Sequence, residues 1–307
     1  MNRFLSFSRA VAIVTAVFVT GPTTAESEKI AQAGCKQAGT FVSVSNYNHN
    51  GRYSAPSLSV ECSGDNVVVR SNGITNFEFV RSTPHDLEEK NYVWRIPRNP
   101  QEASDKKQVP LLGPIGVALN GLPLFGPNES PHHGTGDPYL DGLLDFCGGH
   151  TGPGGTYHFH IIPKCLFDKI EGKVSLVVGY AFDGYPILGP YECTDASCTN
   201  IKKVRSSWQK VNSDRNVWTG NAYQERSGDL DRCNGMKRPD GSYAYYATEK
   251  FPYLLACYHG VAAFNHDVTR GGGGRPGGGR FGGPPPDGRH FGAPPGGRGR
   301  FQGRPQR

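Results

Sequence analysis

Residues 144–160 read LDFCGGHTGPGGTYHFH, and residues 230–246 repeat the pattern as LDRCNGMKRPDGSYAYY. The two stretches align without a gap and share their Leu, Asp, Cys, Pro and Tyr positions, together with two glycines. They differ at three places where only the first copy carries histidine: His150, His158 and His160 against Met236, Ala244 and Tyr246. Because the motif occurs twice and only one copy carries histidines, the fold does not require them, which indicates that these histidines perform chemistry.

A second duplication precedes the first one in each half of the chain. Each copy contains Asn-Gly or Asp-Gly between apolar residues, which predicts a β-hairpin because these residues tolerate the positive φ of a type I′ turn. The matching residues are Gly116, Ala118, Asn120, Gly121, Pro123, Gly126, Pro127 and Glu129 against Gly179, Ala181, Asp183, Gly184, Pro186, Gly189, Pro190 and Glu192.

The fold class follows from short strand-like runs separated by turn residues, with little helical periodicity. These runs are residues 40–44, 57–61, 67–70, 92–96, 157–162 and 174–182. We expect a mainly β globular part over residues 26–269, loop-rich and stapled by disulfides. Its duplicated segments, about 116–166 and 179–258, predict two pseudo-symmetric antiparallel β units packed as one domain.

The first 25 residues resemble a secretory signal, with arginines ahead of an apolar run at 10–19 and small residues at the exit. No stretch approaches the roughly 20 apolar residues of a membrane-spanning helix, so we expect a secreted or periplasmic protein without a transmembrane anchor. The eight cysteines then predict four disulfides. Spacing alone does not fix the pairing, but the repeat and proximity favour Cys35 with Cys62, Cys147 with Cys165, Cys193 with Cys198, and Cys233 with Cys257.

Residues 270–307 hold the basic charge of the chain. They contain eight Arg and one Asp, a net charge of +7 against +6 for the whole sequence, so the rest carries −1. Their Gly, Pro and Arg composition predicts a disordered tail. We expect such a tail to bind anionic polysaccharide or a cell surface through its charge. The alternative is a solvated tail without a partner. Secretion argues against nucleic acid as the partner.

The candidate site centres on His158 and His160, which share one face of an expected strand because side chains alternate. His150 lies ahead of them across the turn 151–155, which could swing a third imidazole inward. Asp145 and Asp141 are nearby carboxylates that could complete the shell or orient an imidazole. A histidine-rich site favours copper or zinc over calcium or magnesium. The alternative is a buried, hydrogen-bonded histidine pair that ties loops together.

Other histidines give weaker signals. His132 and His133 lie in an expected loop and are more typical of solvated residues, although they could supplement the site. His259 follows Cys257 and Tyr258 and could reach across the interface between the halves. His49 is typical of a turn residue.

The chain resembles the YHYH family, which is named for a Tyr-His-Tyr-His strand. Residues 157–160 nearly reproduce that strand as Tyr-His-Phe-His. The resemblance covers about residues 110–262 and includes four further motifs: CGGH at 147–150, PKCL at 163–166, GYAFDGYPILGP at 179–190 and FPY at 251–253. It implies an extracytoplasmic protein without an established activity. Family members often repeat the histidine strand in the second copy, and this chain departs there with YAYY at 243–246.

Three functions follow from these features. The first is a secreted or periplasmic metal-binding protein that uses His150, His158 and His160. The second is a metal-dependent enzyme, since three histidines and an open position form a familiar catalytic zinc site, with Asp145 or Asp183 as a candidate base. No nucleophile elbow, phosphate loop or zinc-protease helix motif supports a specific enzyme class. The third is an adhesive or matrix-associated protein that acts through its basic tail.

Overall fold

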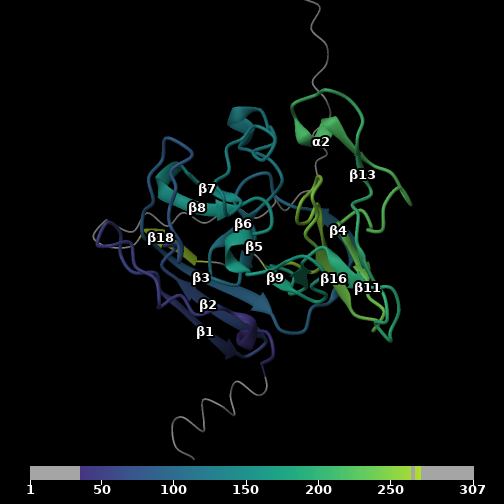
Figure 1. Cartoon of the computed structure of the whole chain (residues 1–307), viewed down its shortest axis with the longest axis horizontal. Coiled ribbons are helices and arrows are strands. Elements are labelled where there is room, and N and C mark those ends of the chain that lie inside the picture. The colour runs from purple at the N-terminus through teal and green to yellow at the C-terminus, as the bar shows by residue number, and fades with distance from the viewer. Residues whose placement is uncertain (1–34, 264–266, 271–307) are drawn as a thin grey trace, which may run out of the picture.

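The computed structural model describes residues 35–263, and residues 267–270 by their backbone (Figure 1). The expected signal at 1–25 and the tail at 270–307, apart from the backbone of Arg270, lie outside this part of the chain. Within the described ranges, no helix is long and apolar enough to cross a membrane.

An eight-stranded sheet forms the centre of the molecule, in the order β15-β16-β10-β9-β5-β6-β8-β7. Its strands are short, and most of their side chains are buried. They are β5 (Pro114–Ala118), β6 (Pro123–Phe125), β7 (Gly149–Gly152), β8 (Thr156–Phe159), β9 (Val177–Ala181), β10 (Pro186–Leu188), β15 (Gly235–Lys237) and β16 (Tyr243–Tyr246).

The strand order reads the same outward from the middle of this sheet in both directions. The hairpins β5–β6 and β9–β10 meet through an antiparallel pairing of β5 with β9, where Gly116 faces Ala181 and Ala118 faces Gly179. Outside each hairpin lie a parallel strand, β8 or β16, and an antiparallel edge strand, β7 or β15. A Cβ at Gly116 would lie 2.5 Å from the Tyr180 carbonyl oxygen, so the close approach of β5 and β9 requires glycine there. The finer expectation of two pseudo-symmetric units stays a prediction.

A four-stranded sheet covers the first half of the larger sheet (Figure 1). It consists of β1 (Leu58–Ser63), β2 (Asn66–Ser71), β3 (Lys90–Pro97) and β18 (Asp267–Arg270), in that order. Buried Val67 and Trp94 of this sheet share one hydrophobic core with Ile115 and Val117 of β5. The Trp94 indole also donates a 3.0 Å hydrogen bond to the Gly121 carbonyl, which ties the sheets together at the β5–β6 turn.

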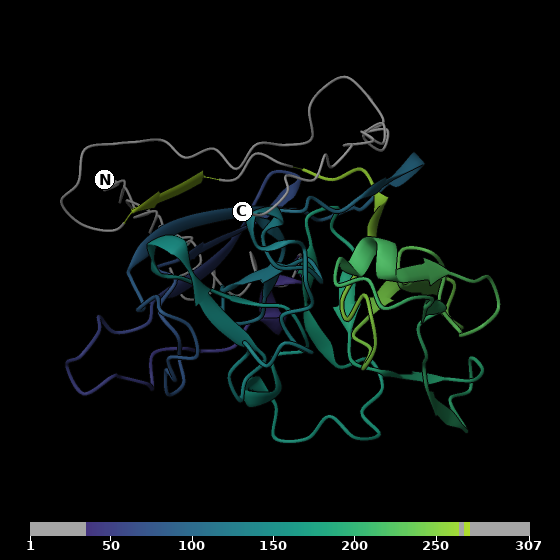
Figure 2. The same cartoon turned by 90° about the horizontal axis from the view of Figure 1, so that it is seen from above.

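Three two-stranded sheets surround the second half, on the green and yellow side of Figure 2. They pair β4 (Glu102–Gln108) with β17 (Cys257–Gly260), β11 (Tyr191–Cys193) with β12 (Ile201–Lys203), and β13 (Trp208–Lys210) with β14 (Asn221–Tyr223). The described helices are one turn of α-helix and four 3₁₀ turns: α2 (Val217–Gly220), η1 (Ala38–Thr40), η2 (Pro131–His133), η3 (Pro153–Gly155) and η4 (Lys164–Leu166).

The predicted mainly β class and the four disulfides are confirmed. The bonds are Cys35–Cys62, Cys147–Cys165, Cys193–Cys198 and Cys233–Cys257, the pairing that proximity and the repeat favour. Five of the six expected runs overlap a strand, but residues 40–44 do not. There the chain leaves η1 and makes one backbone hydrogen bond to the larger sheet, from the Val42 amide to the Leu119 carbonyl, which is too little pairing for a strand.

Candidate metal centre

The hairpin of β7 and β8 positions the three histidines of the first copy. His150 lies directly opposite His158 in the antiparallel pairing. His160 follows β8, and its amide donates to the Gly148 carbonyl, which extends the pairing by one residue. We expected His150 to swing in on a flexible turn, but strand pairing places it, and only residues 153–155 form the turn.

The three imidazoles meet in a buried cluster, as the sequence predicts for His158 and His160 on one face of β8. Their residues are 2–5% exposed. The Nε2 atom of His150 lies 3.1 Å from Nε2 of His158 and 3.1 Å from Nε2 of His160. Tyr157 and Phe159, on the opposite face, are buried in the hydrophobic core. Alternation along one short strand therefore places the side chains of the hydrophobic core on one face and the histidines of the cluster on the other.

Backbone carbonyls fix the protonation pattern of two of these rings. Nδ1 of His158 lies 3.0 Å from the Thr156 carbonyl oxygen, and Nδ1 of His160 lies 2.6 Å from the Gly126 carbonyl oxygen. A carbonyl only accepts hydrogen bonds, so each Nδ1 carries the proton. In the neutral ring the Nε2 atom then has a free lone pair. Both lone pairs point into the cluster, which is the arrangement of histidines that ligate a metal.

Burial keeps the three imidazoles neutral. Desolvation lowers the pKa of His150 to about 4, although the nearby Leu143 carbonyl opposes it. Desolvation, with the neighbouring imidazoles, lowers the pKa of His160 to about 3 and holds the pKa of His158 well below its usual value. At neutral pH all three rings are uncharged, the form that binds metal.

A carboxylate that the sequence did not single out as a ligand lies beside this cluster of imidazoles. Oε1 of Glu129 lies 3.2 Å from Nε2 of His150 and 3.9 Å from Nε2 of His160. This oxygen is buried and makes no hydrogen bond. Burial raises the pKa of Glu129, while the Ser130 amide and His133 oppose the shift. The one available signal was its place in the hairpin duplication, where it matches Glu192.

Asp145, which we expected to complete the shell, does not join the imidazoles; the candidate metal-ligating group found among the described residues consists of the three histidines. Its Oδ1 accepts hydrogen bonds from the Cys147 and Gly149 amides, and its Oδ2 accepts one from the Tyr157 hydroxyl at 2.8 Å. Asp231 makes the same bonds in the second copy. Asp145 therefore holds the loop in shape ahead of β7.

The remaining candidates lie around the cluster or away from it. Asp141 pairs with Arg215 at the surface, 2.8 Å apart. His133 is exposed and approaches the second oxygen of Glu129, whereas His132 is exposed in the same turn. His259 stacks on the ring of Tyr243 in the second half, with ring centroids 3.6 Å apart. None of these side chains belongs to the candidate metal-ligating group in the described part of the chain.

Comparison with known families matches residues 93–260 to the family described as YHYH protein. The chain belongs to the YHYH family. The match spans the central sheet and both copies of the repeat, and it includes the Tyr157-His158-Phe159-His160 strand. No curated protein and no solved structure matches the chain.

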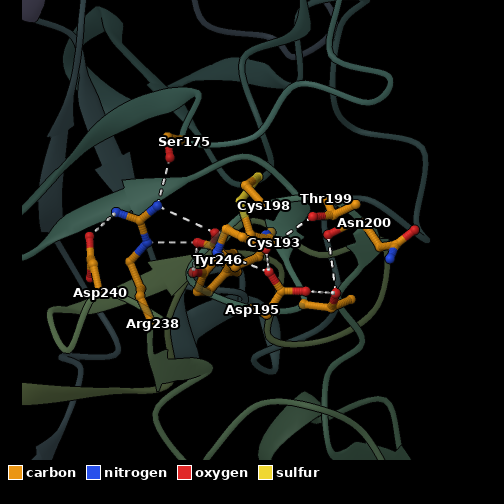
Figure 3. The surroundings of a disulfide bond; sticks show 12 residues. Ser175, Cys193, Asp195, Cys198, Thr199, Asn200, Arg238, Asp240 and Tyr246 are labelled. Atoms are coloured by element: carbon orange, nitrogen blue, oxygen red, sulfur yellow. Dashed lines mark hydrogen bonds and ion pairs between the residues drawn. A yellow bond between two sulfur atoms is a disulfide. The ribbon is translucent and has the colours of Figure 1, made fainter.

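Within this YHYH region, the second copy places an arginine beside the glutamate that corresponds to Glu129. Glu192, the counterpart of Glu129, accepts hydrogen bonds from Arg238 Nε at 2.6 Å and from the Tyr246 hydroxyl. Figure 3 shows Arg238 beside Tyr246, with Ser175 and Asp240 at its other nitrogens. Burial favours a higher pKa for Glu192, but the hydrogen bonds from Arg238 and Tyr246 outweigh burial and lower the pKa. The first copy has Gly152 where the second has Arg238, so Glu129 has no corresponding arginine.

The histidine cluster of this YHYH protein opens onto a cavity of about 500 Å³. All three imidazoles and Glu129 line it. Phe125 forms part of its wall and stacks on His158, with ring centroids 3.9 Å apart. The cluster is thus buried against the protein on one side and faces a chamber on the other.

Proposed function

We propose that this YHYH-family protein binds a divalent transition-metal ion, copper or zinc, through Nε2 of His150, His158 and His160. Glu129 supplies a carboxylate beside the ion. The observation that carries the proposal is the convergence of three buried Nε2 atoms, with two pairs 3.1 Å apart. Four ligands in a tetrahedron at 2.0–2.1 Å from zinc lie about 3.4 Å from one another, so the rings need to move little.

A hydrogen-bonded histidine cluster explains the geometry less well. His158 and His160 both donate from Nδ1, so neither has a proton at Nε2 to share. His150 can donate one Nε2 proton to one of them. Its close contacts with the other imidazole and with Glu129 then have no hydrogen bond. A cation coordinated by all four atoms explains why they lie so close together.

The second copy supports this interpretation by internal comparison. The proposal includes a pseudo-symmetric relation between the two halves, for which the mirrored strand order and the register of β5 with β9 are the support. In the second half, Arg238 neutralises the buried Glu192. In the first half, a metal ion takes the place of that guanidinium beside Glu129. The two copies thus satisfy equivalent carboxylates with different cations.

The proposed setting is extracytoplasmic. Four disulfides persist in oxidising compartments such as the periplasm or the cell exterior. A protein there that holds copper or zinc sequesters the ion, delivers it or uses it as a structural element.

Metal analysis of the purified, tag-free protein tests the proposal. After dialysis against copper or zinc, we expect one ion per chain in the wild type and none in a His158→Ala/His160→Ala variant. His133→Ala is the matched control, because this exposed histidine lies beside Glu129 outside the cluster. Equal and negligible metal in the wild type and the double variant would overturn the proposal.

A metal-dependent enzyme is the second candidate, favoured by the cavity onto which the imidazoles open. Catalytic zinc sites keep one position free for water or substrate. If the ion has such a position, azide changes the visible spectrum of the cobalt-substituted protein. A spectrum that azide leaves unchanged argues for a closed, non-catalytic site.

The basic tail remains a separate proposal, because it lies outside the described residues. We propose that its charge holds the protein on anionic polysaccharide or a cell surface. Deletion of residues 271–307 tests this: retention on an anionic matrix at low salt should fall, whereas unchanged retention removes the idea.

A further inference from the structure

The cavity above the metal centre has an apolar entrance. Leu111 and Leu112, in the segment between β4 and β5, line it and are 41% and 54% exposed. Leu143 and Pro84 contribute from two further loops. Exposed leucines that converge on a cavity are typical of a binding surface rather than of ordinary solvent-exposed chain.

Several polar groups of the wall are already engaged within the protein. The Thr83 hydroxyl donates to the Thr151 carbonyl, and the Thr151 hydroxyl donates to the His85 carbonyl, both at 2.7 Å. The Asn128 amide donates to the Leu111 and Glu129 carbonyls and accepts from the Trp218 indole. These groups offer a ligand little, so recognition falls to the apolar walls and to the metal at the floor.

We infer that the cavity binds a small amphiphile, with an oxygen-donor head that coordinates the metal and an apolar body. The head lies at the ion held by His150, His158 and His160, and the body lies along Leu111 and Leu112. A chamber of about 500 Å³ falls within the range of small-molecule sites. This inference rests on the proposed function, because the ion supplies the contact for the head.

Alkyl hydroxamates of increasing length probe this site in the cobalt-substituted full-length protein. Their shared head perturbs the visible spectrum of the metal, and only the body changes from acetohydroxamic to octanohydroxamic acid. We expect affinity to rise about fourfold for each buried methylene. Metal-free protein provides the reference for binding of the alkyl chain alone.

A Leu111→Ser/Leu112→Ser variant tests the walls, and its partly exposed positions tolerate the change. It should keep its cobalt and its affinity for acetohydroxamic acid, but bind octanohydroxamic acid about tenfold more weakly. Leu140→Ser is the control, because Leu140 is 70% exposed and does not line the cavity.

Two outcomes overturn the inference and are distinguishable. If cobalt binds but hydroxamate affinity does not depend on chain length, the apolar site is wrong and the metal proposal stands. If cobalt does not bind at all, the proposed function fails and the inference fails with it.

Discussion

The glutamates Glu129 and Glu192 show how one residue type serves two purposes in this chain. Each follows its own copy of the duplicated hairpin, β5–β6 or β9–β10, and the two approach matching residue positions, His160 and Tyr246. Burial raises the pKa of Glu129, whereas Arg238 and Tyr246 hold the pKa of Glu192 down against its own burial. The two carboxylates therefore differ in their surroundings: Glu192 has Arg238 as its partner, and Glu129 lies beside imidazoles.

Exchange of each carboxylate for an amide should separate these purposes. We expect Glu129→Gln to weaken metal binding about 10–100-fold, since an amide is a poorer ligand and loses the negative charge. Glu192→Gln should leave metal binding unchanged but lower the free energy of unfolding by roughly 3 kcal/mol, because it leaves Arg238 without its buried partner. Metal competition titrations and urea unfolding measure the two effects. Equal metal affinity in wild type and Glu129→Gln would contradict the assigned role.

The buried imidazoles predict an acid-sensitive metal-free protein. Desolvation lowers the pKa of His150 to about 4 and that of His160 to about 3, against about 6.5 in the unfolded chain. Between these values the unfolded chain binds protons that the folded chain does not. The stability these rings contribute is therefore complete above pH 6.5 and is lost as the pH falls toward 4.

The size of this loss is on the order of 3 kcal/mol each for His150 and His160 at pH 4.5. Urea unfolding in the presence of a chelator, from pH 7.5 to pH 4.5, measures it. The His158→Ala/His160→Ala variant lacks two of the rings, so its unfolding free energy should fall less over the same range. Parallel curves for the two proteins would show that the rings are not buried and neutral.

At the scale of elements, the hairpin of β7 and β8 unites the histidines, and only part of it follows from the sequence. Alternation along Tyr157-His158-Phe159-His160 predicts which rings share a face. The strand β7 was not predicted, because Gly149–Gly152 is half glycine and has little β propensity of its own. Tertiary contacts instead decide its conformation: Asp145 bonds to the Gly149 amide, and Gly149 packs against Tyr157.

Glu129 could not be assigned from sequence for a related reason. It lies far from the histidines along the chain, and the parallel pairing of β6 with β8, Leu124 opposite Phe159, brings it beside them. Parallel pairing across a long connection leaves no local pattern in the sequence. Asp145 shows the converse, because its nearness in sequence suggested a ligand where the structure has a loop cap.

Gly149 provides a direct test of the hairpin. A Cβ there would lie 2.5 Å from the His158 carbonyl oxygen and 2.6 Å from the Tyr157 hydroxyl. Gly149→Ala should therefore lower the unfolding free energy by about 1–3 kcal/mol and also reduce metal content, because it shifts β7 from β8. Gly235→Ala, which clashes with Tyr243 in the second copy, should lower stability alone. Full metal content in Gly149→Ala would show that the pairing does not align the ligands.

At the scale of the whole molecule, the proposed metal centre joins two parts of the fold. Glu129 comes from the loop after β6, and the histidines come from the β7–β8 hairpin. An ion held by both links them in the folded state only, so binding should stabilise the protein through mass action. The Cys147–Cys165 disulfide links the start of this hairpin to η4 and is the covalent counterpart of that link.

Thermal unfolding measures this coupling. With zinc at about 100 times its dissociation constant, we expect about 2.7 kcal/mol of added stability, or a melting temperature higher by about 5–10 °C for a domain of this size. The His158→Ala/His160→Ala variant should show no increase. An equal rise in both proteins would assign the effect to binding elsewhere.

The position of β7 at the outer edge of the eight-stranded sheet has a consequence for kinetics. An edge strand has a neighbour on one side alone, so it frays more readily than the strands inside the sheet. His150 is carried on that strand, whereas His158 and His160 are carried on or beside its inner neighbour. Release of the proposed ion should then require the opening of one peripheral strand while the core stays folded. The exchange rate of the metal should follow the hydrogen-exchange rate of the β7 amides rather than the rate of global unfolding.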